Sequence, residues 1–383
     1  DLGQVLRETA QVRQARQVFR ADVGRRQFRF SWRCPPREAL PIVFGQFLQS
    51  GAVCQFSPGH PHAASCRVFL DGLIVLSARR ARQETARALA PVRARAGKRW
   101  YNQYNIRIQE VNMPEHLIPL GTSGLMVPPV AVGCMRISSL GAPRVERFVG
   151  QAMEAGLNFF DHADIYGKGT CEELFSKAYK ALGYKREQAI LQSKCGIVPG
   201  KRFDFSKEHI LLSVDGILRR LQTDYLDVLL LHRPDALVEP EEVAEAFDQL
   251  QSSGKVRHFG VSNQHPRQIE LLRRHVKQPI VANQLQFGIM HTGMIDQGIH
   301  VNMLDEGAVD RDGGILDYCR LHDITIQAWS PFQHGFFSGV FIDNPDFPEL
   351  NEALSQVAQA HGVSSTTIAV AWILRHPAKI QVV

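Results

Sequence analysis

The chain has 383 residues, of which 44% are hydrophobic and 21% charged, a composition typical of globular proteins. This composition excludes a collagen-like fibre and disorder of the whole chain. Apolar runs stay well short of the roughly 18 residues that a membrane-spanning helix needs, so we expect no membrane partner. Seven scattered cysteines without a CxxC pair favour a reducing compartment, and we predict a cytoplasmic protein without a metal site.

The net charge of +6 is unevenly distributed along the chain. Residues 1–112 hold 18 Arg and one Lys against seven acidic residues, whereas residues 113–383 have a net charge of −6. The first segment lacks sustained helix or strand periodicity, so we expect an Arg-rich extension that is disordered or non-native. The alternative is a basic arm that binds nucleic acid, because arginine neutralises phosphates. We place the domain boundary at Met113.

From Met113 onward, short apolar runs alternate with amphipathic stretches, which is typical of parallel strands covered by helices. Eight such units in about 270 residues favour a (β/α)₈ TIM barrel over a doubly wound sheet. No GxGxxG motif follows the first run, which argues against the doubly wound alternative. The expected strands are 129–135, 157–161, 189–194, 227–232, 258–262, 280–284, 324–330 and 380–383. The expected helices are 144–155, 172–182, 207–221, 241–251, 266–275, 349–360 and 364–375.

Six successive apolar runs each end in a polar residue. The active site of a TIM barrel lies at these C-terminal ends of the strands. A strand that merely reaches water can end this way, but a set containing Asp, Lys and His on one barrel face indicates a catalytic site. These residues are Asp161, Lys194, His232, the pair Ser262 and Asn263, Gln284, and Ser330.

The motifs around these positions resemble the aldo-keto reductase superfamily, in particular a bacterial branch of general aldo/keto reductases. The resemblance spans about residues 115–383 and implies NAD(P)-dependent reduction of aldehydes or ketones, with a small-molecule carbonyl compound as the partner. The motifs are FFDHADIYG at 159–167, QSKCG at 192–196, LLLHRPD at 229–235, GKVRHFGVSN at 254–263, ANQLQF at 282–287 and WSPF at 329–332.

The resemblance implies a catalytic tetrad of Asp161, Tyr166, Lys194 and His232. Tyr166 is the expected proton donor; because a free tyrosine has a pKa near 10, we expect the Lys194 ammonium to lower it. Asp161 is the counter-charge that a buried lysine needs. His232 is expected to orient the carbonyl oxygen or to share the proton. The alternative is a purely structural Asp–Lys pair beside a packed tyrosine.

The resemblance also implies a cofactor site, with NADPH expected and NADH as the alternative. Ser262, Asn263 and Gln284 match the residues that hold the nicotinamide carboxamide, and Trp329 matches the aromatic residue that stacks on the ring. The remaining expected contacts are the backbone at Gly133 and Cys134, and Ser330 and Phe332 beside the pyrophosphate.

Several expectations concern other parts of the chain. Val383 lies inside the eighth strand, so we expect a C-terminally truncated barrel without its last helix and without the adenosine-binding segment. The stretch 288–314 either lines a substrate pocket with Met290, Met294 and Met303 or packs on itself. His162, His265 and His361 are expected to be ordinary loop or surface residues. Alternative functions are a cofactor-binding regulatory subunit, like potassium-channel β subunits, and nucleic-acid binding through the basic arm; the oligomeric state is left open.

Overall fold

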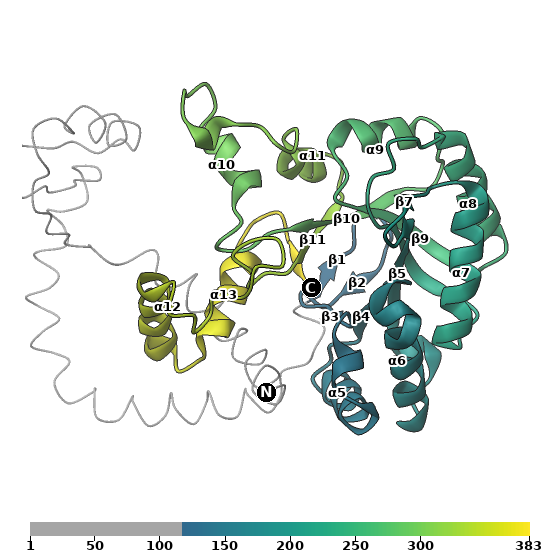
Figure 1. Cartoon of the computed structure of the whole chain (residues 1–383), viewed down its shortest axis with the longest axis horizontal. Coiled ribbons are helices and arrows are strands. Elements are labelled where there is room, and N and C mark those ends of the chain that lie inside the picture. The colour runs from purple at the N-terminus through teal and green to yellow at the C-terminus, as the bar shows by residue number, and fades with distance from the viewer. Residues whose placement is uncertain (1–116) are drawn as a thin grey trace, which may run out of the picture. The chain divides into compact units, whose positions relative to one another are not determined.

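The computed structural model describes residues 117–383, so the expected extension 1–112 and its boundary lie outside the described residues. Eight parallel strands form one sheet in the order β12-β11-β10-β9-β8-β5-β4-β3. A parallel bridge between Val130 and Val382 joins the two ends of this order, and the Ala131 N–H donates to the Val382 oxygen at 2.7 Å. The sheet therefore closes into the predicted (β/α)₈ barrel (Figure 1).

All eight barrel strands coincide with predicted apolar runs. They are β3 (Val132–Gly133), β4 (Phe159–Asp161), β5 (Ile190–Cys195), β8 (Leu226–Leu231), β9 (Val256–Ser262), β10 (Ile280–Gln286), β11 (Thr325–Trp329) and β12 (Gln381–Val382). Side chains alternate between the barrel interior and the surrounding helices. In β8, Val228 and Leu230 belong to the inner apolar cluster, whereas Leu229 and Leu231 pack in the cluster shared with the helices.

The helices cover the outside of the barrel with amphipathic faces. In α7, Ile210, Val214 and Ile217 are buried at helical spacing, and the Ser206 side chain caps the helix by accepting from the His209 N–H. The predicted helices are α5 (Ala142–Glu154), α6 (Thr170–Ala181), α7 (Lys207–Leu221), α8 (Pro240–Ser252), α9 (Pro266–Arg273), α12 (Pro348–His361) and α13 (Ser365–Leu374). The short helices α10 (Gly293–Ile299) and α11 (Ile315–Leu321) were not expected.

A hairpin of β1 (Ile118–Pro119) and β2 (Met126–Val127) closes the N-terminal end of the barrel. Leu120 and Val127 are fully buried in the inner cluster. Gly121 has φ 51°, and a Cβ there would lie 2.3 Å from the Val281 oxygen, so only glycine fits this turn. With this end closed, the C-terminal ends of the strands carry the open face.

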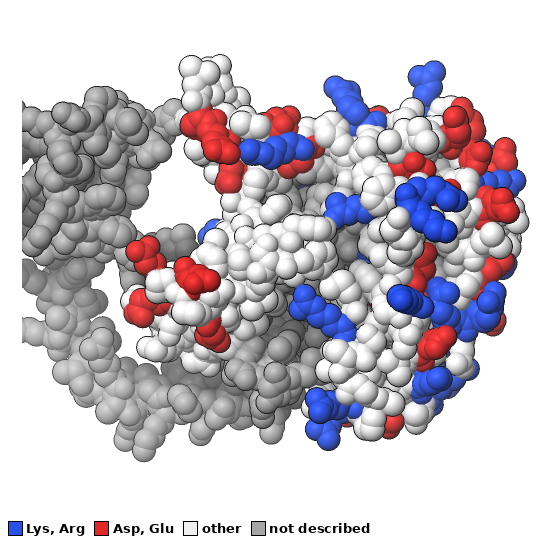
Figure 2. All heavy atoms as spheres, in the orientation of Figure 1, with Lys and Arg blue, Asp and Glu red and all other residues white. Residues whose placement is uncertain are grey.

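The surface of the described residues mixes charges of both signs. Figure 2 shows basic and acidic side chains interspersed over the helices on one face. Among residues 117–383, no single helix is long and apolar enough to span a bilayer; α12 and α13 meet that criterion only together, across a bend of 91°.

Candidate active site

A cavity of about 630 Å³ opens among the C-terminal ends of the barrel strands. Its volume suits a small molecule or cofactor. Most of the predicted site residues line it, whereas Lys194 and Cys134 lie behind its wall. The predicted residues in the lining are Gly133, Asp161, Tyr166, His232, Ser262, Asn263, Gln284, Trp329, Ser330 and Phe332.

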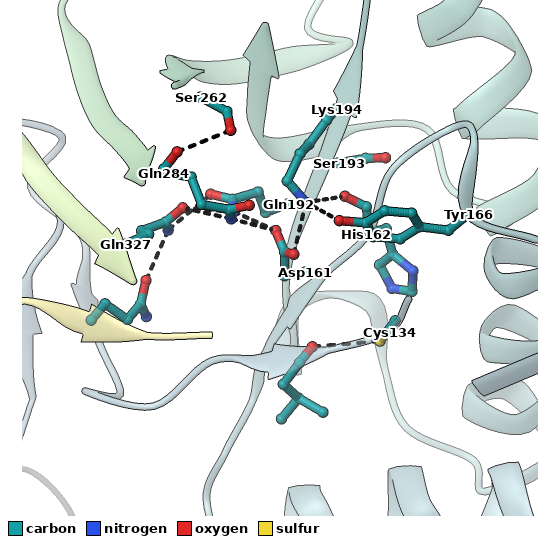
Figure 3. A network of polar contacts seen from close by, with 12 residues as sticks. Cys134, Asp161, His162, Tyr166, Gln192, Ser193, Lys194, Ser262, Gln284 and Gln327 are labelled. Atoms are coloured by element: carbon teal, nitrogen blue, oxygen red, sulfur yellow. Dashed lines mark hydrogen bonds and ion pairs between the residues drawn. The ribbon is translucent and has the colours of Figure 1, made fainter. Parts of the chain in front are cut away.

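Lys194 is fully buried on β5 and lies beside Asp161, the last residue of the neighbouring strand β4 (Figure 3). Its Nζ donates to Asp161 Oδ2 at 2.7 Å, to the His162 backbone oxygen at 2.8 Å and to Tyr166 Oη at 3.1 Å. These acceptors use all three ammonium protons. Burial lowers the pKa of Lys194, but Asp161 and Tyr166 outweigh burial and hold it above its ordinary value. Lys194 is therefore a cation.

Tyr166 begins the short 3₁₀ helix η4 (Tyr166–Gly169) that follows β4. Burial raises the pKa of its hydroxyl above 10, and the Lys194 ammonium acts in the opposite direction. The effect of Lys194 has the expected sign, but burial is the larger cause, so the expectation of a lowered tyrosine pKa is wrong for this structure. The hydroxyl consequently carries its proton at neutral pH, as a proton donor must.

His232 directly follows β8 and presents its ring to Tyr166, with ring centroids 6.0 Å apart and planes at 82°. Burial, together with the charges of Lys194 and Arg233, holds the pKa of His232 well below its ordinary value. The imidazole is therefore neutral near pH 7. A neutral imidazole still has one N–H group, which can donate a hydrogen bond to a carbonyl oxygen.

On the opposite wall of the cavity, a series of hydrogen bonds links Trp329, Asn263, Ser262 and Gln284. Trp329 Nε1 donates to Asn263 Oδ1 at 3.1 Å, and Asn263 Nδ2 donates to Ser262 Oγ at 2.8 Å. Ser262 Oγ in turn donates to the Gln284 backbone oxygen at 3.0 Å. Asn263 and Ser330 have φ of 56° and 49°, a left-handed conformation that turns the chain sharply after β9 and β11. Strained backbone of this kind concentrates at functional sites.

Cys134 was predicted among the cofactor residues through its backbone. Its side chain is fully buried, and its Sγ donates to the Val132 oxygen at 3.5 Å. Burial raises the pKa of this thiol well above its ordinary value, so it is not a reactive thiolate. The role of its backbone stays a prediction.

A layer of glutamines lies beneath the cavity, and of its members only Gln284 was a predicted site residue. Gln192 Nε2 and Gln284 Nε2 both donate to Asp161 Oδ1, at 2.6 and 3.0 Å. Gln327 accepts from both amides and donates to Gln381 Oε1 at 2.8 Å. The one signal in the sequence was a glutamine in each of these four apolar runs.

His162 corrects a further expectation, because it is neither a surface residue nor an ordinary loop residue. It is completely buried, edge-on to Phe175 with ring centroids 4.7 Å apart. Burial, helped by the Lys194 charge, lowers the pKa of His162 to about 3. His265 behaves as expected, on the surface at the start of α9, where its ring accepts from the Arg267 N–H at 3.2 Å.

No residue of the stretch 288–314 is among the described lining residues of the cavity. The stretch contains α10, and Met294 is buried in the main apolar cluster. Met290 and Met303 are each 38% exposed, and the described cavity lining includes none of the three methionines. The structure therefore does not support the interpretation that these methionines line the pocket, and Met294 packs against the barrel core rather than only within the stretch itself.

The cavity also has lining residues that sequence analysis did not single out. Phe336, Phe337 and Val340, on the loop after β11, form an apolar wall. Arg233 and Arg136 add positive charge. The sequence offered one clue, because Arg233 directly follows His232. Among residues 117–383, no group of three His, Cys, Asp or Glu side chains could hold a metal ion.

The buried Asp161–Lys194 pair and Tyr166 lie at the C-terminal ends of the strands, the face on which (β/α)₈ barrel enzymes carry their active sites. Residues 129–383 match the Aldo/keto reductase family. The chain belongs to this family, as the motifs predicted.

Similar proteins agree with this assignment. The uncharacterized oxidoreductase YcsN of Bacillus subtilis is 40% identical over 239 residues, covering 60% of this chain and 73% of the relative. A 6-dehydroglucose reductase of Novosphingobium aromaticivorans is 33% identical over 281 residues, which cover 71% of this chain and 86% of the relative. The structure of an aldo/keto reductase from Klebsiella pneumoniae in complex with NADP and acetate superposes with a TM-score of 0.53 at 25% identity, covering 70% of this chain and 84% of that one. The chain is an NAD(P)-dependent oxidoreductase.

Proposed function

We propose that this enzyme reduces aldehydes or ketones to alcohols, with NADPH as the cofactor and Tyr166 as the proton donor. One observation carries the proposal: at the edge of a cavity, the buried Lys194 ammonium lies 2.7 Å from Asp161 and 3.1 Å from the Tyr166 hydroxyl. Such an arrangement supports proton transfer to a carbonyl oxygen.

The cavity wall has the chemistry that a nicotinamide requires. The carboxamide needs both donors and acceptors, which Ser262, Asn263 and Gln284 supply from adjacent strand ends. The planar ring needs an aromatic neighbour, and the Trp329 indole is held beside these groups by its bond to Asn263. When bound, the reduced cofactor supplies a hydride. A structural neighbour solved with NADP favours NADPH over NADH.

The protein's own side chains account for the proton. Tyr166 holds it at neutral pH and donates it to the carbonyl oxygen, while His232 orients that oxygen as a neutral hydrogen-bond partner. The Lys194 ammonium stabilises the phenolate that remains on Tyr166, since it already donates to the same oxygen. Asp161 keeps Lys194 charged and in position.

The test is NADPH consumption by the 383-residue chain with a panel of aldehydes and ketones, followed by the nicotinamide absorbance. We expect many turnovers per protein and one alcohol formed per NADPH consumed. A cofactor-binding regulatory subunit would instead bind NADPH and consume no more than one equivalent. That second result would overturn the proposal.

A further inference from the structure

The described lining of the cavity carries an excess of positive charge. Arg136 and Arg233 both line it, and Asp161 is the one acidic side chain among the described lining residues. Asp161 is neutralised by the Lys194 ammonium at 2.7 Å. The two guanidinium groups therefore set the sign of the potential in the cavity.

Arg233 is the better placed of the two, because it is half-buried and directly follows His232, whereas Arg136 is exposed. Its guanidinium carbon lies 5.8 Å from the centre of the Trp329 ring and 5.7 Å from that of Phe336. Burial lowers the pKa of Arg233, yet an arginine stays charged at neutral pH. The rings of Trp329 and Phe336 thus position the charged, planar guanidinium group of Arg233 at the cavity wall.

No carboxylate among residues 117–383 forms an ion pair with Arg233. The nearest acidic residue in the sequence, Asp235, uses its two oxygens to accept from the backbone N–H groups of Phe205 and Leu237, both at 2.9 Å. A half-buried guanidinium whose five donors have no hydrogen-bond partner among residues 117–383 is suited to a ligand that brings its own acceptors.

We propose that Arg233 binds a carboxylate on the carbonyl substrate, so that the enzyme prefers aldehydes or ketones that carry an anionic group. A guanidinium matches a carboxylate with two parallel hydrogen bonds. The apolar wall of Phe336, Phe337 and Val340 fits the carbon skeleton between that carboxylate and the carbonyl. This inference rests on the proposed function, since the carbonyl is the group that Tyr166 would protonate.

A cofactor phosphate is the other source of an anion with the same chemistry. The residues proposed for the cofactor, such as Ser262 and Gln284, come from β9 and β10. Arg233 comes from the end of β8, next to His232, which faces Tyr166. Its guanidinium reaches Trp329, which is proposed to lie against the nicotinamide ring, and that end of the cofactor carries no phosphate. This position beside the reacting groups favours the substrate.

The experiment compares para-carboxybenzaldehyde with methyl para-formylbenzoate, an aldehyde of similar shape without the charge. The measured quantity is the ratio of kcat/KM for the acid to kcat/KM for the ester, so a general loss of activity or of folded protein cancels. In Arg233→Met we expect this ratio to fall by about tenfold or more, because the acid loses a hydrogen bond to a charged group. Arg233→Lys keeps the charge without the fork and should give an intermediate ratio. The matched control is Arg267→Met, because Arg267 lies on the exposed surface of α9. This variant should have the same acid-to-ester ratio as the wild type.

Two further measurements separate the possible failures. An unchanged ratio in Arg233→Met, with an increased NADPH dissociation constant, would assign Arg233 to a cofactor phosphate and overturn the inference. If the wild-type chain reduces neither these two aldehydes nor any compound of the panel, the proposed function fails, and calorimetric titration with benzoate and benzamide then tests the anion site alone. Tighter binding of benzoate that is lost in Arg233→Met supports the site. Equal affinity for benzoate and benzamide overturns it.

Discussion

Gln284 donates a hydrogen bond from Nε2 to Oδ1 of Asp161 over 3.0 Å, while Oδ2 of the same carboxylate accepts from Lys194 at 2.7 Å. The residue proposed to hold the nicotinamide amide and the lysine that contacts Tyr166 therefore share one buried carboxylate (Figure 3). Hydrogen bonds linked in this way polarise one another in a low dielectric. A substitution at Gln284 consequently changes the hydrogen bonding of the Asp161 carboxylate that pairs with Lys194.

Replacing Tyr166 with Phe removes the proposed proton donor and little else. We expect kcat/KM for carbonyl reduction to fall by about 10² to 10⁴, because general acid catalysis supplies a factor of that size. The NADPH dissociation constant, measured by fluorescence titration, should stay at its wild-type value. Tyr184→Phe is the matched control, since Tyr184 is partly buried and outside the described cavity lining. Wild-type turnover in Tyr166→Phe would contradict the assignment.

Replacing Lys194 with Met leaves the Asp161 carboxylate buried without its cation. Breaking a buried ion pair on one side costs about 3–5 kcal/mol, and we expect a loss of this size in the free energy of unfolding, measured with urea. The double variant Asp161→Asn with Lys194→Met carries no buried charge at this point and should recover most of the loss. Neither variant should reduce carbonyls. A single variant as stable as the wild type would show that the pair is not buried as described.

The barrel and the residues around the cavity were largely predictable from the sequence. Each strand lies in a mainly apolar run, and polar residues such as Asp161 and Ser262 stand where runs end. Because parallel strands bring their C-terminal ends to one face, residues far apart in the chain were expected to meet there. Lys194 and Asp161, 33 residues apart, do so.

Other features depend on tertiary contacts that no local pattern reports. Gln327 lies inside an apolar run, and a period of two does not say which of the two faces is the barrel interior. His162 is buried because the Phe175 ring of α6 packs against it, a contact set by helix packing. The opposing effects of burial and of Lys194 on the Tyr166 pKa could be compared only once the exposure of the hydroxyl was known.

Replacing Gln327 with Leu should destabilise the barrel, since three amides lose a partner. Gln192, Gln284 and Gln381 all hydrogen-bond Gln327, and each of these side chains is buried. A buried polar group left unpaired costs about 1–3 kcal/mol, so the free energy of unfolding should fall by at least that amount. Gln356→Leu, on the exposed side of α12, serves as the control and should unfold like the wild type. Equal stability of the two variants would refute the role of the glutamine layer.

Asp164, three residues after β4, should make the stability of this protein depend on pH. Its Oδ1 is buried without a hydrogen-bond partner among the described residues. Burial, reinforced by the Glu172 carboxylate and opposed by Arg220 and Lys194, raises the pKa of Asp164 from 3.8 to about 7. The folded protein therefore holds a proton that the unfolded chain releases near pH 3.8.

This difference in proton binding determines whether the free energy of unfolding rises or falls with pH. Stability from the protonated Asp164 is fully present below about pH 4, falls as the pH rises to about 7, and is lost above that value. At about 1.4 kcal/mol per pH unit, the loss is at most about 4 kcal/mol. Asp164→Asn keeps a neutral side chain at every pH, so urea unfolding should find it more stable than the wild type at about pH 8 and equal at about pH 4. Asp346→Asn, at an exposed position, should follow the wild-type profile, and an Asp164→Asn profile parallel to the wild type would refute the shifted pKa.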